Sequence, residues 1–183
     1  MVRVVHGLYK AMRRLRGWWF AVWIRAWGGR VGRSLEIERG VRLRWAPNSG
    51  IQIGSDVYLG NGVIIDVHRT GLLSIGDRAK VMHYTIIAVS DSVEIGEDSQ
   101  IAESSSIRDS DHGMALGAPM RDQLLSAPVT IGSDVWVGRG VCVTRGSAVG
   151  DGAVIGANSV VRGVIPARSV AVGAPAVVKR ARS

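Results

Sequence analysis

Aliphatic side chains return every six residues over most of this chain, and the rhythm predicts its architecture. The repeated positions are Ile53, Leu59 and Ile65; Ile75, Val81 and Ile87; Ile95, Ile101 and Ile107; Ile131, Val137 and Val143; and Val149, Ile155 and Val161. Neither an α-helix nor an ordinary alternating strand has a period of six. Short strands joined by tight turns and stacked as a solenoid do, with three hexads in each triangular coil. We therefore expect an all-β solenoid over residues 31–166.

The interruptions of this rhythm indicate where function resides. The step from Ile65 to Ile75 is four residues longer than a hexad and contains His68, and a shorter insertion lies near Ser90. A polar excursion at about residues 113–128 separates Ile107 from Ile131. Loops on a rigid solenoid are where binding and catalytic residues concentrate. We therefore expect the site beside these loops.

Charge and tryptophan set residues 1–30 apart from the rest. The net charge is +8, of which +7 comes from this segment, through Arg3, Lys10, Arg13, Arg14, Arg16, Arg25 and Arg30, with no acid among them. Trp19, Trp23 and Trp27 recur every fourth residue, which predicts one face of an amphipathic helical arm. The remainder is near neutral, so no nucleic-acid partner is expected.

Two interpretations of the tryptophan face remain open at this point. Indole rings and arginine suit the interface of a membrane, so the arm would associate peripherally with its inner, cytoplasmic face. Alternatively, the face packs on the main domain or on a neighbouring subunit. The apolar run from Trp18 to Ile24 is far shorter than the roughly 20 residues that a bilayer span requires.

The cysteine content and the chain end complete the outline. Cys142 is the single cysteine, so nothing demands an oxidising compartment and a cytoplasmic location is expected. No base motif adjoins it, which favours a small buried hydrophobe over a nucleophile. In residues 167–183 we expect a strand at 169–172, a break at Gly173–Pro175 and a short basic helix at 176–182.

Several motifs stand on the hexad background: Asp109–Gly113, Pro119, Arg121, Pro128–Gly138, Ile155–Val161 and Gly173–Ala176. With the rhythm, they resemble the hexapeptide-repeat acyltransferases over roughly residues 31–180. The most similar members are the sugar O-acetyltransferases of polysaccharide and O-antigen biosynthesis, with maltose and galactoside acetyltransferases as relatives. The resemblance implies a left-handed parallel β-helix of about five to seven coils. It also implies acetyl-CoA as cosubstrate, no metal, a saccharide acceptor, and a homotrimer with acetyl-CoA between adjacent subunits.

His112 is the candidate general base. A sugar hydroxyl is a weak nucleophile, and a neutral imidazole suits removal of its proton; the resemblance also places the family's catalytic histidine here. A carboxylate on the other ring nitrogen would fix the tautomer. Asp109 and Asp111 are both near enough, and we favour Asp109 slightly. Counting from Ile107, His112 takes the last position of its hexad, which predicts a place at the end of a regular side.

The resemblance supplies the remaining candidates. The positions that match coenzyme A contacts, together with a nearby cation, are Trp136, Arg139, Ala157, Arg162, Gly163, Lys179 and Arg180. The candidates for the acceptor are His68, Met82 and His83. Maltose-type relatives have an asparagine near position 82–83, and its replacement here puts the acceptor contact in doubt.

Three other functions compete with this one. An acetyltransferase for a small metabolite, such as serine or an antibiotic, would differ in the acceptor pocket around residues 68, 83 and 113–128. A zinc-dependent γ-type carbonic anhydrase would use His68, His83 and His112 between subunits. That family's pattern needs two histidines separated by four residues, which this chain lacks. An inert scaffold would not need His112 with carboxylates beside it.

Overall fold

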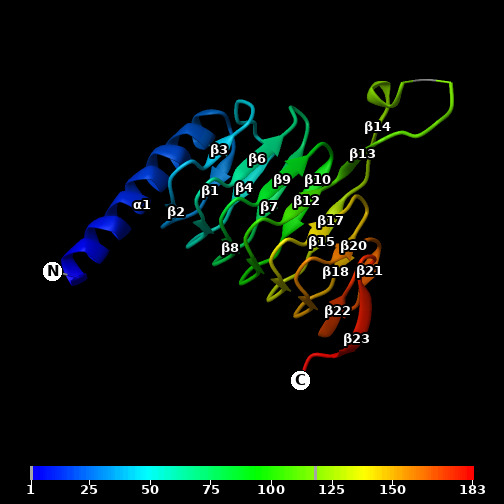
Figure 1. Ribbon diagram of the computed structural model, residues 1–183. Coiled ribbons are helices and arrows are strands. Elements are labelled where there is room, and N and C mark those ends of the chain that lie inside the picture. Colours follow the sequence, from blue (N-terminus) through cyan, green and yellow to red (C-terminus); the bar gives the residue numbers. More distant parts are fainter. Residues whose placement is uncertain (1, 118) are drawn as a thin grey trace.

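A computed structural model describes residues 2–117 and 119–183. The long helix α1 (Val2–Ala26) lies across one end of a parallel β-helix, and the C-terminus lies at the other end (Figure 1). Three sheets form the sides of six complete coils, and two strands begin a seventh. The predicted N-terminal helix and parallel β-helix are confirmed.

Each coil contributes one strand to each of three sheets in turn. Sheet A contains β1 (Arg30–Val31), β4 (Ile51–Ile53), β7 (Leu72–Ile75), β10 (Ser92–Ile95), β15 (Val129–Ile131), β18 (Ala148–Val149) and β21 (Val164–Ile165). Sheet B contains β2 (Glu36–Ile37), β5 (Tyr58–Leu59), β8 (Lys80–Val81), β11 (Gln100–Ile101), β16 (Trp136–Val137), β19 (Val154–Ile155), β22 (Ser169–Val172) and the antiparallel β23 (Val177–Ala181). Sheet C contains β3 (Arg42–Leu43), β6 (Ile64–Val67), β9 (Ile86–Val89), β12 (Ser106–Arg108), β17 (Cys142–Val143) and β20 (Val160–Val161).

The hexad aliphatics fill the inside of the coils. Ile101 pairs with Val81 of the coil before and Val137 of the coil after, and all three are fully buried. Each buried aliphatic therefore stacks on its equivalents, and neighbouring coils stabilise one another. The six-residue period of the sequence reflects this continuous column, because each sixth residue contributes one of its buried side chains.

The three edges of the β-helix differ in how tightly they turn. Each passage from sheet A to sheet B, and from B to C, contains a residue with positive φ: Ser34, Gly40, Asp56, Gly62, Arg78, Tyr84, Asp98, Ser104, Asp134, Gly140, Gly152, Asn158 and Arg168. The passages from sheet C back to sheet A vary in length and include every interruption noted in the sequence. We call this last edge the C–A edge; it tolerates insertions because no uniform tight turn closes it.

Helix α1 docks on the first coils through small and aliphatic side chains. Ala21 and Ile24 are buried, and a Cβ on Gly17 would collide with the backbone of Leu35. Trp19 and Trp23 are exposed. The interpretation that the tryptophan face packs on this chain's own main domain is therefore wrong.

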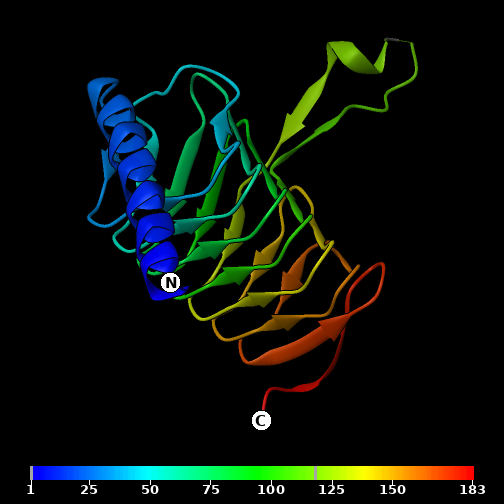
Figure 2. The same ribbon diagram turned by 60° about the vertical axis from the view of Figure 1, so that its left-hand side comes forward.

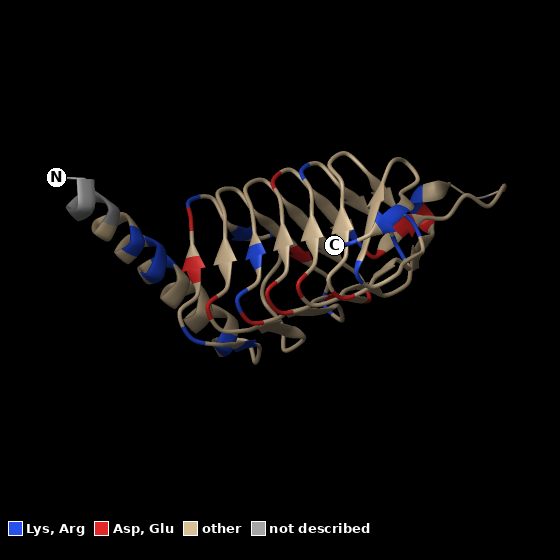
Figure 3. Ribbon diagram, turned by 90° about the horizontal axis from the view of Figure 1, so that it is seen from below, with Lys and Arg blue, Asp and Glu red and all other residues tan. Residues whose placement is uncertain are grey.

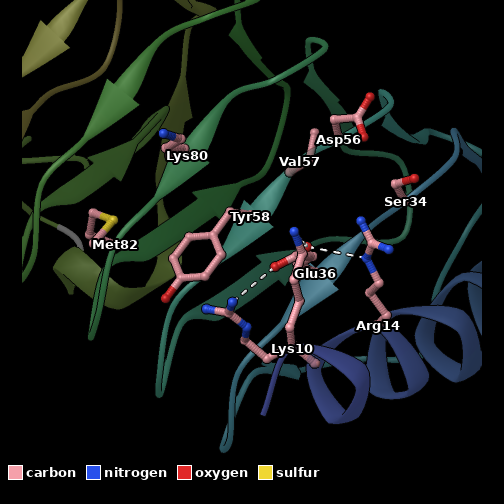
Figure 4. Close-up of a pocket in the computed structure, with 10 residues that line it drawn as sticks. Lys10, Arg14, Ser34, Glu36, Asp56, Val57, Tyr58, Lys80 and Met82 are labelled. Carbon is pink, nitrogen blue, oxygen red and sulfur yellow. Dashed lines mark hydrogen bonds and ion pairs between the residues drawn. The ribbon is translucent and has the colours of Figure 1, made fainter. Parts of the chain in front are cut away.

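A polar cluster beneath the helix ties it to the coils (Figure 4). Arg13 lies 3.3 Å from Glu36 and 3.5 Å from Glu38, measured between guanidinium nitrogen and carboxylate oxygen. The Tyr58 hydroxyl donates to Glu38 at 2.7 Å. Burial, and then the bond to Glu38, raise the pKa of Tyr58 to about 12. The cluster holds the arm against β2 and β5.

The predicted C-terminal helix is wrong. Strand β22 forms as expected, but the chain reverses after Gly173, and β23 pairs antiparallel with β22. Val177 and Val178 favour an extended backbone, and β22 would otherwise leave a row of backbone groups unpaired. Strand β23 satisfies that edge.

Candidate active site

A hairpin leaves the C–A edge after the fourth coil (Figure 2). It consists of β13 (Ser110–His112), the short 3-10 helix η1 (Met120–Asp122) and β14 (Leu124–Ser126). The chain rejoins the β-helix at Val129, which pairs with Val93. The excursion begins three residues earlier than about 113, so the prediction that His112 ends a regular side is wrong. His112 instead stands on β13, outside the coil.

Asp109 is the residue that turns the chain out of the coil. Its side chain is fully buried, and its carboxylate accepts hydrogen bonds from the backbone N–H groups of Ser90 (2.8 Å) and Asp91 (2.7 Å). These amides belong to the C–A passage of the coil before. The carboxylate therefore joins two coils, and the structure does not bring it to His112 as the slight preference for Asp109 required.

Asp111 lies on the other side of β13. Successive side chains of a strand point to opposite faces, and Asp111 faces Arg145, with 3.5 Å between Oδ2 and Nε. Arg145 follows β17 in the next coil. The structure therefore directs this second predicted partner away from His112 as well.

The imidazole of His112 is exposed and held by a backbone carbonyl. Its Nδ1 lies 3.2 Å from the carbonyl oxygen of Met120 in η1. A carbonyl oxygen only accepts, so this hydrogen bond requires the proton on Nδ1. In the neutral ring, Nε2 is then the unprotonated nitrogen and can accept a proton. The residue that selects the tautomer is Met120, which sequence reasoning missed because a backbone carbonyl has no sequence signal.

Within one chain, most of the other predicted residues lie at two edges of the β-helix, one on each side of sheet C. The C–A edge holds His68, Arg162 and Gly163 together with the His112 hairpin. The opposite edge, between sheets B and C, holds Met82, His83, Arg139 and Ala157, and Trp136, Lys179 and Arg180 lie on sheet B. The structure therefore does not gather the predicted site in a single chain.

The residues of the B–C edge are partly committed to local contacts. His83 accepts a hydrogen bond at Nδ1 from the backbone N–H of Asn61 (2.9 Å), and Glu38 lies 3.8 Å from the same nitrogen. Arg139 lies 3.6 Å from Glu103 on the exposed surface. Trp136 is exposed on β16. These side chains form an open surface rather than an enclosed pocket.

Two further observations bear on ligands. Among residues 2–117 and 119–183, no group of three His, Cys, Asp or Glu side chains is arranged to hold a metal ion. A cavity of about 630 Å³, which sequence reasoning missed, lies on the C–A edge between Trp27, the loop 45–49 and the His68–Arg69 segment. The extra residues around His68 were the only signal for it.

Comparison with known proteins gives consistent similarities. Residues 128–163 match the family described as bacterial transferase hexapeptide (six repeats). The chain is 38% identical over 147 residues to a protein of Mycobacterium tuberculosis named as an acetyltransferase, covering 79% of this chain and 49% of the other. It is 36% identical over 138 residues to a protein of Escherichia coli named as a lipopolysaccharide biosynthesis O-acetyl transferase, covering 70% of each. The chain thus spans about half the length of the mycobacterial relative.

Solved structures share the architecture. A maltose O-acetyltransferase from Clostridium difficile superposes with a TM-score of 0.61 at 27% identity, covering 87% of this chain and 73% of the other. A mutant of AntD, an N-acyltransferase from Bacillus cereus solved with dTDP-4-amino-4,6-dideoxyglucose and coenzyme A, superposes with a TM-score of 0.74 over 87% of each chain. At 19% identity, AntD supports the fold alone.

Proposed function

The chain belongs to the hexapeptide-repeat acyltransferases, and from this premise we propose that it is an acetyl-CoA-dependent O-acetyltransferase acting on a saccharide hydroxyl. The observation that carries the proposal is the exposed His112 imidazole, whose Nδ1 lies 3.2 Å from the Met120 carbonyl oxygen, while no residue among 2–117 and 119–183 is hydrogen-bonded to its Nε2. The similarity to a lipopolysaccharide biosynthesis O-acetyl transferase and to a maltose O-acetyltransferase supports a sugar as acceptor.

His112 acts as general base in the proposed reaction. Its Nε2 takes the proton of the sugar hydroxyl while the hydroxyl oxygen attacks the thioester carbonyl of acetyl-CoA. A carbon–oxygen bond forms, the carbon–sulfur bond breaks, and the proton passes from the imidazolium to the departing sulfur. The products are an acetylated sugar and coenzyme A. A base of this kind contributes roughly 10²–10⁴-fold to the rate.

The carbonyl of Met120 takes the orienting role that the sequence predicts for a carboxylate. It fixes the tautomer and the ring direction, and its dipole favours the imidazolium that forms during proton transfer. A neutral carbonyl stabilises that cation less than a carboxylate does. The main contribution of Met120 is therefore to select the neutral tautomer in which Nε2 is the nitrogen that accepts the proton.

We propose that a homotrimer completes the site. The two groups of predicted residues lie at opposite ends of sheet C, and a four-residue strand such as β9 spans about 13 Å. If the C–A edge of one chain meets the B–C edge of the next, the groups come together. Exposed apolar side chains on the hairpin support such a contact: Met114, Leu116, Leu124 and Leu125.

Coenzyme A would lie between the paired edges. Trp136, Arg139 and Ala157 would line the cleft from one chain, and Arg162 and Gly163 from the other. Lys179 and Arg180 on β23 add cations for the phosphates. The Nδ1 of His83 accepts a hydrogen bond from Asn61, so its Nε2 is the nitrogen that would contact the acceptor, from the B–C edge.

For the N-terminal arm we propose peripheral binding to the inner face of the cytoplasmic membrane. In the described residues, no helix is long and apolar enough to cross a membrane. The outward face of α1 exposes Trp18, Trp19 and Trp23, and basic residues run along the same helix (Figure 3). Indole rings at headgroup depth suit a helix lying in the interface, whereas Lys10, Arg13 and Arg14 are paired with Glu36 on the side of the helix that faces the coils. This placement would bring the enzyme to a lipid-linked acceptor.

The catalytic proposal is tested by following release of the coenzyme A thiol with acetyl-CoA and a panel of sugars and lipid-linked glycans. His112→Ala should lower the rate at least about 100-fold, whereas Arg121→Ala, an exposed position on the same hairpin, should leave it near wild type. Full acetyl transfer by His112→Ala would refute the general-base assignment.

The membrane proposal is tested by flotation with phosphatidylglycerol vesicles. The double variant Trp19→Ser, Trp23→Ser should remain in the unbound fraction, while Trp136→Ser, an exposed tryptophan of sheet B, should float like wild type. Equal flotation of all three proteins would contradict the proposal. Substitution is preferable to deletion of residues 1–30, because Arg13 and Ile24 belong to the packed structure.

A further inference from the structure

The geometry points to a second saccharide subsite on the C–A edge. We propose that the cavity between Trp27, the loop 45–49 and the His68–Arg69 segment, here called the tryptophan cavity, binds the unreacting part of an oligosaccharide acceptor. The inference rests on the proposed function, since it assumes a saccharide acceptor. The second subsite would bind sugar units of the acceptor that lie beyond the residues around His112.

Trp45 is exposed but held in one orientation. Its Nε1–H donates to Asp66 at 2.8 Å, and the other carboxylate oxygen of Asp66 binds Arg44 at 3.2 Å. The Arg44 guanidinium also lies over the indole ring, 5.9 Å from its centroid. More than half of the Trp45 surface, 56%, remains accessible. A flat ring fixed before binding loses little freedom when a ligand stacks on it.

The loop that carries Trp45 is fastened to the next coil. Asn48 donates from Nδ2 to the carbonyl oxygen of His68 (3.0 Å), and its Oδ1 accepts from the N–H of Gly50 (2.7 Å). The first of these bonds joins the first and second passages of the C–A edge, and the second shapes the loop itself. The wall of the tryptophan cavity is therefore set by contacts between coils and does not depend on a ligand to form.

The chemistry of the lining fits a sugar ring better than an acyl chain. The electron-rich face of an indole attracts the polarised C–H groups of a pyranose, and Trp27 and Trp45 both line the tryptophan cavity. Ser49, His68 and Arg69 lie exposed at its rim and can bond to sugar hydroxyls. Its volume of about 630 Å³ is in the usual range for ligand sites. An acyl chain would form no hydrogen bonds with these polar groups.

The position relative to His112 suits one extended ligand. The tryptophan cavity borders the passage after β6, and the hairpin leaves the passage after β12, two coils further along the same edge. Stacked strands are about 4.8 Å apart, so the near side of the tryptophan cavity is roughly 10 Å from the hairpin along the axis, and Trp45, in the passage after β3, is roughly 14 Å from it. The passage between them, after β9, is short and does not obstruct the edge. An oligosaccharide of a few units can reach from one to the other.

The test compares Trp45→Ala with the conservative Trp45→Phe and with Trp18→Ala, a similarly exposed tryptophan on α1. Binding is measured by calorimetric titration of maltohexaose, and of O-antigen oligosaccharides of two to six units, into a His112→Ala background that cannot turn over. We expect Trp45→Ala to raise Kd about tenfold, a loss of about 1.4 kcal/mol. Trp45→Phe should raise it less than about threefold, and Trp18→Ala should leave it unchanged. Equal thermal midpoints would confirm that the variants fold.

Turnover separates this inference from the proposed function. In an otherwise wild-type chain, Trp45→Ala should raise KM for the oligosaccharide about tenfold, with kcat, KM for acetyl-CoA and KM for a monosaccharide unchanged. An unchanged Kd and KM would overturn the subsite while leaving the His112 mechanism intact. Loss of binding in Trp45→Ala alongside full turnover by His112→Ala would overturn the mechanism and keep the subsite. If Trp45→Ala weakens binding of phosphatidylglycerol vesicles but not of glycans, the tryptophan cavity holds lipid and the saccharide subsite is refuted.

Discussion

Replacing Asp109 with alanine should destabilise the protein without removing a group that acts in the chemistry. The buried carboxylate is the acceptor for the N–H groups of Ser90 and Asp91. An unpaired buried donor costs about 1–3 kcal/mol, and water reaches these two in part because their residues are not fully buried. We expect a combined loss of about 2–4 kcal/mol. For a chain of this length, this lowers the thermal midpoint by roughly 4–16 °C.

Asp111→Ala is the matched control. Its carboxylate is about half exposed and makes one ion pair, 3.5 Å from Arg145, so its loss should cost less than about 1 kcal/mol. Both variants are followed by differential scanning calorimetry and by amide hydrogen exchange. The amides of Ser90 and Asp91 should exchange faster in Asp109→Ala and normally in Asp111→Ala.

One outcome would separate a structural role of Asp109 from a catalytic one. If Asp109→Ala kept the wild-type midpoint and the wild-type exchange at Ser90 and Asp91, yet lost thiol release as severely as His112→Ala, Asp109 would be a partner of the histidine and the structural role would be wrong. We expect Asp109→Ala to have a lower thermal midpoint. Its activity should recover when the assay temperature is lowered, because the folded hairpin then holds His112 in place.

Three further predictions follow from the packing. Ile101→Ala should lower the free energy of unfolding by about 2–5 kcal/mol, and Val164→Ala, on an exposed side chain, by less than about 0.5 kcal/mol; equal urea midpoints would contradict the buried column. Since the pKa of Tyr58 is about 12 when folded and 10.0 as a free group, the unfolded chain loses this proton first, and stability should fall as pH rises from about 10 to about 12. Tyr58→Phe should flatten that part of the urea-midpoint profile, and an unchanged slope would show that Tyr58 is not the group involved. Gly17→Ala should cost about 1–3 kcal/mol through a clash with the first coil, while Gly7→Ala, in open space, should be neutral or stabilising by up to about 1 kcal/mol; an equal midpoint for both would mean that α1 is not docked as described.

The sequence determined the architecture because the same packing recurs in every coil and places an aliphatic residue at every sixth position. Each sixth aliphatic must point inside a coil, as Ile101 does between Val81 and Val137, so the period alone identifies the β-helix. The interruptions at His68 and beyond Ile107 likewise located the edge that carries loops. The basic tryptophan-rich segment was predicted as a helix for the same reason, since spacing by four is itself the signature.

Only the tertiary structure decided which groups meet. Asp109 binds amides 18 and 19 residues away, Met120 orients His112 through a backbone atom, and Trp45 is fixed by Asp66 across 21 residues. No local pattern encodes these contacts, because those of Asp109 and Trp45 depend on how one coil lies on the next, and that of Met120 on how the hairpin folds back on itself. The C-terminal segment makes the same point: its basic composition suggested a helix, and the open edge of β22 selected a strand. Hexad spacing determines a column of buried side chains, whereas the chemistry of the C–A edge depends on loops from different coils, whose contacts are set by the stacking itself.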